Sequence, residues 1–383
     1  GSVSILAKDE STINALTGGV AISGKGNAVG AAIGANYIYN KVNANSDKAT
    51  VKALAGDLTL EAEETAEINA ITIGGAGGDG LSIGASVSIN YIGNDATASI
   101  TGATSNVMAH GNLRVIAQDT ATIIAIAGGL AIGGKTGVGA SVNNDVVKDT
   151  TKAYVDGGAA VSADGATSTF VDVLGDTRQG VSIEANASET LVIVGVGGAF
   201  SKEGAGAGAL TLTIFDVTAK AYEDTPSAST NPNAGISSLK DVDIVAKGHL
   251  QLDGIAGALA GAGNVAVGIG VDGGGITRHI EAYVAPNAKA HAGNNVIVKA
   301  FADLTQVSVS AAGAFSKSAA VTVTAGVAVL DLTTLAYIGN GASVTSDGTC
   351  WCPRKKTRPR TRFRAMSRAP APARSASPRA WRP

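Results

Sequence analysis

The sequence predicts an all-β fold, namely a parallel β-helix or β-solenoid of about six repeats. Three observations predict it: a strand pattern that recurs six times, a glycine-rich phrase at a nearly fixed offset after each such strand, and no segment with helical periodicity. The 383 residues are 45% hydrophobic but only 4% aromatic, and 51 are glycine, so small side chains carry the apolar surface. Small inward side chains suit a column of stacked coils.

Six segments alternate apolar and polar residues, as a strand with one buried face does. They read SVSILAKD, DLTLEAEE, NLRVIAQD, GVSIEANA, DVDIVAKG and NVIVKAFA. Each reaches an alanine that we expect to be a structural repeat position, and these alanines recur every 54 to 68 residues: Ala7, Ala62, Ala117, Ala185, Ala246 and Ala300. The spacing predicts one repeat region over 1–349, with repeats near 1–53, 54–110, 111–179, 180–240, 241–292 and 293–349.

Each signature strand is followed by a glycine-rich phrase and, in most repeats, by a tyrosine. The phrases include GGVAISG, GGAGGDG and GGLAIGG, and we expect the chain to turn there. The tyrosines, also expected structural repeat positions, stand 37 residues beyond the alanine of their repeat: Tyr154, Tyr222, Tyr283 and Tyr337. One tyrosine per repeat at a fixed offset favours packing between coils over a platform for stacking ligands.

The sequence leaves the number of coils per repeat open. The shortest interval from a tyrosine to the next alanine, seventeen residues from Tyr283 to Ala300, is about one solenoid coil. The rest of a repeat is then two coils, or one coil with an extruded hairpin that turns at the glycine-rich phrase. The longer repeats carry their extra residues in 164–178 and 223–238, whose Pro, Ser, Asn and Asp content predicts surface loops on one side of the repeat.

Two short motifs have possible ligands. Residues 129–136, GLAIGGKT, match the phosphate-binding pattern GxxxxGK[ST], but no helix-forming sequence follows Thr136 and similar phrases recur, so an architectural role is predicted. Residues 74–82, GGAGGDGLS, match a calcium-binding nonapeptide, which makes Asp79 a weak calcium candidate. The flanking nonamers do not repeat that pattern, and this favours a turn residue.

No catalytic, cofactor-binding or further metal-ligating residue is predicted. Acidic residues cluster at 8–10, 61–64 and 118–119, once per repeat at the end of a signature strand, which favours a solvated edge. The four histidines have no metal-ligand spacing, and no serine stands in a nucleophile motif. We therefore expect a chain that is not an enzyme and that uses no cofactor.

Residues 350–383 differ from the body in composition. They hold eleven Lys and Arg and no acid, whereas residues 1–349 hold 18 basic and 31 acidic residues. Taken at face value, this is a disordered, basic, Pro-rich tail of the kind that neutralises phosphates on nucleic acid or anionic lipid. A shifted reading frame can instead encode LVSAEEDATTD, a seventh signature strand, so a frameshift artefact is the favoured hypothesis; the nucleotide sequence across Thr349 and Cys350 decides it.

The repeat motifs resemble those of a known family. The six signature strands, together with GGVAISGKGNAVG (18–30) and AYVDGGAAVSADG (153–165), resemble the β-strand repeat region of large secreted filamentous adhesins of Gram-negative bacteria, the filamentous haemagglutinin and leukotoxin-like family. The resemblance covers residues 1–349. It implies a non-enzymatic shaft, extracellular or on the bacterial cell surface, that mediates attachment or presents a distal module. Its implied partner is a receptor or glycan on a host or neighbouring cell.

Two other functions stay open at this point. A glycan-processing β-helix enzyme would gather acids from adjacent coils in one groove, and a calcium-binding repeat module would depend on the ion for its stability. Unpaired coil ends predict self-association through the solenoid ends. We expect no transmembrane segment, because the apolar run 254–271 contains six glycines, and no nucleic-acid partner unless the basic tail is genuine.

Overall fold

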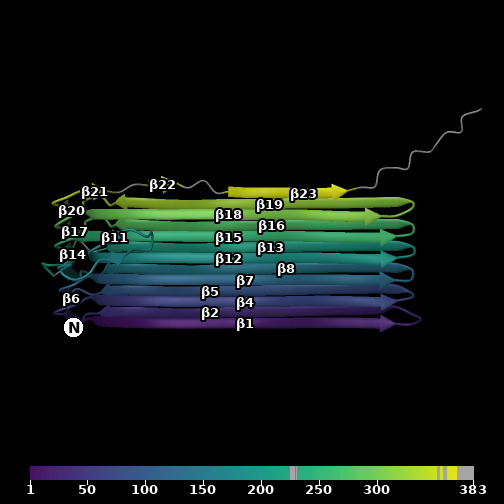
Figure 1. The fold of residues 1–383 in the computed structure, drawn as a ribbon, viewed down its shortest axis with the longest axis horizontal. Helices are drawn as coiled ribbons and strands as arrows, with labels where there is room; N and C mark the ends of the chain where they lie inside the picture. Colours follow the sequence, from purple (N-terminus) through teal and green to yellow (C-terminus); the bar gives the residue numbers. More distant parts are fainter. Residues whose placement is uncertain (225–228, 230, 352–353, 357–359, 369–383) are drawn as a thin grey trace, which may run out of the picture.

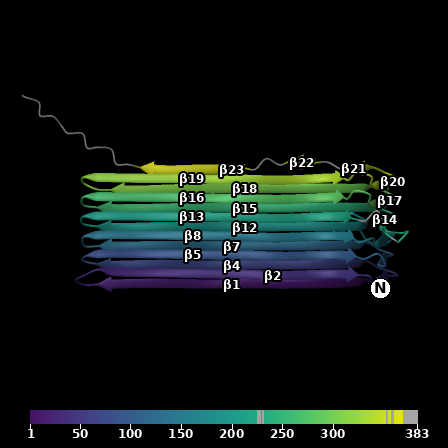
Figure 2. The same cartoon turned by 180° about the vertical axis from the view of Figure 1, so that it is seen from behind.

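Three β-sheets, each made of parallel strands, run along the stack of coils, which Figures 1 and 2 show from opposite sides. The computed structural model describes residues 1–383 except 225–228, 230, 352–353, 357–359 and 369–383. Each repeat gives one long strand to the first sheet, one long strand to the second and one short strand to the third. The all-β solenoid of six repeats is therefore confirmed.

The long strands form two facing sheets, and the short strands close one side. Sheet A contains β1 (Val3–Ser23), β4 (Leu58–Gly78), β7 (Leu113–Gly133), β12 (Gly180–Ser201), β15 (Asp241–Ala262) and β18 (Val296–Phe315). Sheet B contains β2 (Ala28–Asp47), β5 (Leu81–Thr101), β8 (Thr136–Asp156), β13 (Gly204–Asp224), β16 (Val265–Val284) and β19 (Ala319–Ile338). Sheet C contains β3 (Thr50–Ala53), β6 (Asn106–Ala109), β9 (Ala160–Ala163), β14 (Gly235–Ser238), β17 (Lys289–Ala292) and β20 (Ser343–Ser346).

The coils stack in strict register. The signature alanines pair from one strand of sheet A to the next, so that they form one column on its inner face: Ala7, Ala62, Ala117, Ala185, Ala246 and Ala300. The extra residues of the longer repeats leave this register unchanged, because they lie in the connections beside sheet C. A period-two pattern fixes register in this way, since a slip of one residue would turn every apolar side chain outward.

The expected coil length was wrong. Each complete repeat makes a single coil, because its two long strands cross the whole width of the molecule in opposite directions (Figure 1). β1 pairs with β4 and β2 pairs with β5, so the turn between β1 and β2 joins two facing sheets and forms no hairpin ladder. Alternation of period two is the same for strands that pair and for strands that face each other, and the sequence pattern therefore left the two arrangements open.

The core narrows from the sheet C side to the opposite turns. Next to sheet C it holds fully buried aliphatic side chains such as Leu58 and Leu113. At the other side, a Cβ added to Gly74 would lie 1.7 Å from the carbonyl oxygen of Ala85. Sheets A and B thus touch backbone to backbone there, and in the first four repeats one glycine of each glycine-rich phrase lies inside a strand at this contact: Gly19, Gly74, Gly129 and Gly197.

The described part of the basic tail continues sheet A. Three short strands lie along β18: β21 (Cys350–Trp351), β22 (Arg354–Lys356) and β23 (Arg360–Arg368). The expectation of a disordered arm does not hold for these strands, while 369–383 fall outside the described residues. Arg354 pairs with Ala300, 54 residues earlier, and this is also the interval between Ala246 and Ala300.

Candidate functional site: a buried polar seam

The tyrosines at the repeat positions form a stacked ladder on the outer face of sheet B. Tyr154, Tyr222, Tyr283 and Tyr337 stack one above the next, with ring centroids 4.8, 5.0 and 4.9 Å apart and planes within 5° of parallel. Burial, with the neighbouring phenols, raises the pKa of Tyr222 above its usual range. Tyr222 and Tyr283 have both ring faces covered by neighbouring tyrosines. The ladder therefore packs the coils together and leaves little ring surface on which a sugar could stack.

Truncating the ladder in its middle should cost more than truncating its end. Tyr222→Ala removes two stacked neighbours and is expected to lower the free energy of unfolding by about 2 kcal/mol, whereas Tyr337→Ala removes only one. Guanidinium unfolding followed by circular dichroism measures both. Equal losses for the two variants would mean that stacking does not contribute to stability.

The motifs with possible ligands lie at the turns opposite sheet C. Gly129 is part of β7 and packs against the backbone of Ala140, and β8 begins at Thr136, so no helix follows the phosphate-binding pattern. Asp79 is exposed in the turn between β4 and β5. It does not belong to the group of possible metal-ligating side chains found among the described residues, which lies in the core.

Three histidines face a neighbour one coil away. Nδ1 of His110 lies 3.1 Å from a carboxylate oxygen of Asp164, and Nδ1 of His249 lies 2.8 Å from one of Asp303. His291 contacts the hydroxyl of Thr345 in the same manner, at 2.8 Å. These are contacts between single side chains of adjacent strands, and they tie coils together rather than gather ligands.

The acidic residues at the ends of the signature strands do not all form the solvated edge that we expected. Glu64 and Asp119 lie in the core, where they are 1% and 0% exposed, and this expectation is therefore wrong for both. They stand two residues beyond Ala62 and Ala117 on strands that continue past them. Side chains two residues apart share a face of a strand, so an acid two residues beyond an inward alanine also points inward.

Four buried polar side chains meet at the centre of the core, and we call them the polar seam: Asn94, Asp119, Asp149 and Glu189. Their exposed fractions are 3%, 0%, 1% and 0%. Asn94 joins two of the acids, since its Nδ2 donates to Oδ1 of Asp119 and its backbone N–H donates to Oδ1 of Asp149, both at 2.9 Å. Oxygen atoms of the three carboxyl groups lie within 4.8 Å of one another.

Burial dominates the electrostatics of the seam. It raises the pKa of Asp119 to about 6, against the opposing hydrogen bond from Asn94. It raises the pKa of Asp149 well above its usual range, helped by the nearby charges of Asp119 and Glu189. Glu64, one coil below, has its pKa raised to about 8 by burial and then by the charge of Asp119. A charged carboxylate in this core is costly unless a counter-charge joins it.

One buried cation, Arg278 on β16, acts on the charge of Glu189. It is 2% exposed, and its Nη1 donates to the carbonyl oxygen of Asp303 at 2.5 Å. The charge of Arg278 opposes the raised pKa of Glu189, while its own pKa is lowered by burial. Gly248 provides the space for it, because an added Cβ would lie 2.6 Å from Nη2 of the guanidinium.

A second polar ladder runs beside the seam through the first three coils. Nδ2 of Asn36 donates to Oδ1 of Asn90 at 2.8 Å, and Nδ2 of Asn90 donates to Oδ1 of Asp145 at 2.7 Å. Burial raises the pKa of Asp145 to about 7. Asn90 thus accepts from the coil on one side and donates to the coil on the other, which gives its buried amide partners in both directions.

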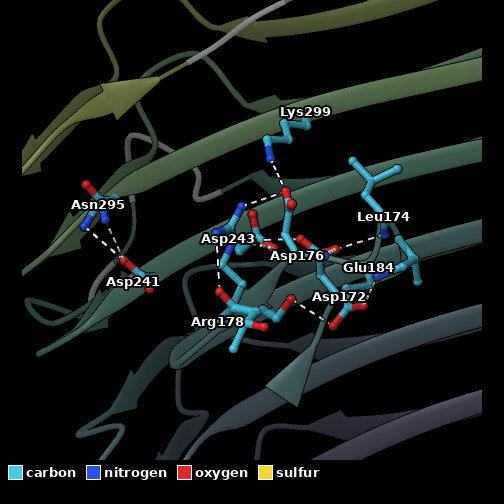
Figure 3. A network of polar contacts seen from close by, with 12 residues as sticks. Asp172, Leu174, Asp176, Arg178, Glu184, Asp241, Asp243, Asn295 and Lys299 are labelled. Atoms are coloured by element: carbon cyan, nitrogen blue, oxygen red, sulfur yellow. Dashed lines mark hydrogen bonds and ion pairs between the residues drawn. The ribbon is translucent and has the colours of Figure 1, made fainter. Parts of the chain in front are cut away.

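The insertion in the third repeat folds back onto the outer face of sheet A, near the sheet C side. It forms the antiparallel pair β10 (Phe170–Val171) and β11 (Thr177–Arg178). Arg178 lies next to three acids, Asp172, Asp176 and Asp243 (Figure 3). Its Nε is 3.7 Å from Oδ2 of Asp172 and 3.8 Å from Oδ2 of Asp243, and its Nη2 is 2.8 Å from Oδ2 of Asp176. The extra residues were predicted to be a surface loop on one side of the repeat, and they begin and end beside sheet C.

Three further contacts surround the insertion on sheet A. Arg114 lies over the ring of Phe170, 4.8 Å from its centroid, and its Nη2 is 2.7 Å from a carboxylate oxygen of Glu184. Lys299 donates to Asp176 from β18, and this hydrogen bond lowers the pKa of that carboxyl group (Figure 3). Arg and Lys side chains thus meet the acids of this network, which identifies it as a clamp that holds the insertion.

The polar seam was missed by sequence reasoning, although a signal for it exists. Asp119 shares the inward parity of Ala117, and Glu189 shares that of Ala185. The side chains of the seam are at most 3% exposed, so no substrate can reach them from solvent in this structure. Acids of adjacent coils do meet, as the glycan-processing alternative requires, but they meet in the core and not in a groove.

Comparisons with family models, with curated proteins and with solved structures give no match for this chain. Among the described residues, no helix has the length and apolar character needed to cross a membrane. The geometry of the stack is therefore the basis for the proposed function.

Proposed function

We propose that the chain is a non-enzymatic structural segment of a secreted or surface-displayed bacterial filamentous adhesin, which mediates attachment or presents a distal module. The observation that carries this proposal is the in-register stack of six coils, each held to the next along its two long strands, with one interruption of the ladder between β5 and β8 at Gly93 and Asn94. In such a solenoid, each coil contacts only its neighbours, and extension adds identical coils. This suits a load-bearing spacer better than a binding cleft.

The dimensions of one coil make the segment broad. Each coil advances the stack by about 4.8 Å, while a strand of twenty residues spans roughly 65 Å. The outer faces that result are wide and parallel to the stacking direction (Figure 2). Attachment to a receptor or glycan would use these faces or a module placed beyond them.

Both ends of the stack carry strand edges that continue the same ladder. β1 pairs with β4 along one edge, and no described strand pairs with its other edge. Inward side chains of this first coil, such as Ile5 and Ile13, are only half-buried. Open edges of this kind pair with further strands of the same geometry. We propose that the first coil stacks on another coil, from the same protein or from a second copy.

End-to-end stacking is the expected behaviour of the full chain. Light scattering should show assemblies that grow with concentration, and electron microscopy should show them lengthening in the stacking direction at constant width. Ile13→Lys places a charge over Ile68 at the bare end and should shorten the stacks. A monodisperse single chain at high concentration, with native circular dichroism, would count against a shaft built in this way.

A further inference from the structure

The polar seam brings together oxygen atoms and almost no hydrogen-bond donors. Asp119 comes from β7, Asp149 from β8 and Glu189 from β12, so three strands of both sheets aim carboxyl groups at one point. Oδ2 of Asp119, Oδ2 of Asp149 and both carboxyl oxygens of Glu189 receive no hydrogen bond from an N–H or hydroxyl donor of the described residues. Buried polar atoms nearly always have partners in folded proteins, and these oxygen atoms therefore call for an explanation.

A neutral side chain gives an independent indication. Asn94 is 3% exposed and lies between two of the acids, to which it donates both of its hydrogen bonds named above. Its Oδ1 has no partner either. Asn94 thus donates to the seam from its backbone and its side chain, and its side chain also brings an oxygen atom without a donor. An amide oxygen of this kind can ligate a cation.

The charges of the seam are not balanced by protein groups. Arg278 opposes the charge of Glu189, and its Nε and Nη2 have no hydrogen-bond partner among the described residues, but it supplies one positive charge against three carboxyl groups. Asp119 and Asp149 then need two positive charges if both are ionised. Burying two such carboxylates without counter-ions would cost free energy comparable with the whole stability of a domain.

We propose that the polar seam binds one hard divalent cation, of the Ca²⁺ class, through Asp119, Asp149, Glu189 and the amide oxygen of Asn94. Carboxylate and amide oxygens are the ligands that such cations prefer, and neither His nor Cys belongs to the group. Ca²⁺ suits the site better than Mg²⁺, because it accepts irregular coordination and bidentate carboxylates. This site is separate from the exposed turn of Asp79.

The closed core makes binding part of folding. The ligands come from the second, third and fourth coils, and the coils around them leave the ligands 0–3% exposed. The ion would enter as these coils close on one another, and it would leave only when they open. Binding that occurs only in the folded state adds directly to stability.

Refolding tests the site. The full chain is unfolded in guanidinium with EDTA, refolded with millimolar CaCl₂ or with EDTA alone, and desalted, and its calcium is then measured by mass spectrometry. We expect about one ion per chain, a higher unfolding midpoint than after refolding in EDTA, and no loss of ion when EDTA is added to the folded protein. Refolding with MnCl₂ should place an anomalous scattering peak between the three carboxyl groups in a crystal.

Matched variants separate binding from folding. Asp149→Asn and Glu189→Gln should refold, as circular dichroism would show, but retain only background calcium. Asp145→Asn removes a buried carboxyl group of the same strand that lies outside the group, and it should retain the ion. Natively folded wild-type chain without retained calcium, or equal retention in Asp149→Asn, would overturn the proposal and leave the acids neutralised by protons.

Discussion

Gly129→Ala is expected to destabilise the protein by about 3 kcal/mol, although it adds a single methyl group. The Cβ of the new alanine would lie 2.0 Å from the carbonyl oxygen of Ala140 and 2.6 Å from its carbonyl carbon. Both are backbone atoms of the facing strand and cannot rotate away. Sheets A and B would have to separate locally, and contacts on both sides of Gly129 would loosen.

The neighbouring glycine provides the matched control. A Cβ at Gly128 would point to the outer face, where its nearest neighbour is Cγ1 of Ile73 at 4.0 Å. Gly128→Ala should therefore be neutral or stabilise the protein by about 0.5 kcal/mol, because glycine weakens a strand. Guanidinium unfolding of both variants measures the difference. Equal midpoints would show that the sheets are not in backbone contact at Gly129.

Raising the pH is expected to destabilise the fold through Asp145. The ordinary pKa of this carboxyl group is 3.8, and burial raises it to about 7 in the folded protein. Between these values the unfolded chain has released the proton and the folded chain still holds it, so stability falls as the pH rises through this window. The full effect of a shift of this size is about 4 kcal/mol.

Asp145→Asn should remove the contribution of this carboxyl group to the pH dependence, while Glu64 and Asp119 keep theirs, and should raise stability most above about pH 7. The new amide would still accept from Asn90, and it could donate to Thr213, its partner on the next strand. Urea unfolding in EDTA at several pH values, for the wild type and the variant, measures the two slopes. A variant with the same slope as the wild type would mean that Asp145 is ionised in the folded state.

The sequence pattern predicted the repeat and its register but not the shape of the coil. The alanine column and the tyrosine ladder could be located because one residue type recurs at a constant offset, and parallel in-register strands bring such residues together. The coil could not be derived, because the strands were assumed to be short. An alternating pattern does not indicate which strand is the hydrogen-bonded neighbour. The sequences of β1 and β2 would have the same alternation if the two strands were paired in one sheet or faced each other in two sheets.

The buried acids show a different limit. Asp119 is expected at a solvated edge because acids recur once per repeat at the ends of the signature strands, although its parity with Ala117 places it inside. Parity is a geometric rule and recurrence is a statistical one, and here the geometric rule holds. The insertion at 164–178 was predicted as a loop from its composition, but its clamp depends on Lys299, more than a hundred residues away, and no local pattern reports such a contact.

The flat cross-section of the coil also determines how a stack of such coils would respond to force. Bending stiffness rises steeply with the depth of a beam in the plane of bending, and the sheets lie roughly 10 Å apart while the strands run several times further. A stack would therefore bend easily in its thin direction, perpendicular to the sheets, and would resist bending within the plane of the sheets. Under shear flow it would turn one broad face to the surface beside it, which sets the orientation of whatever that face carries.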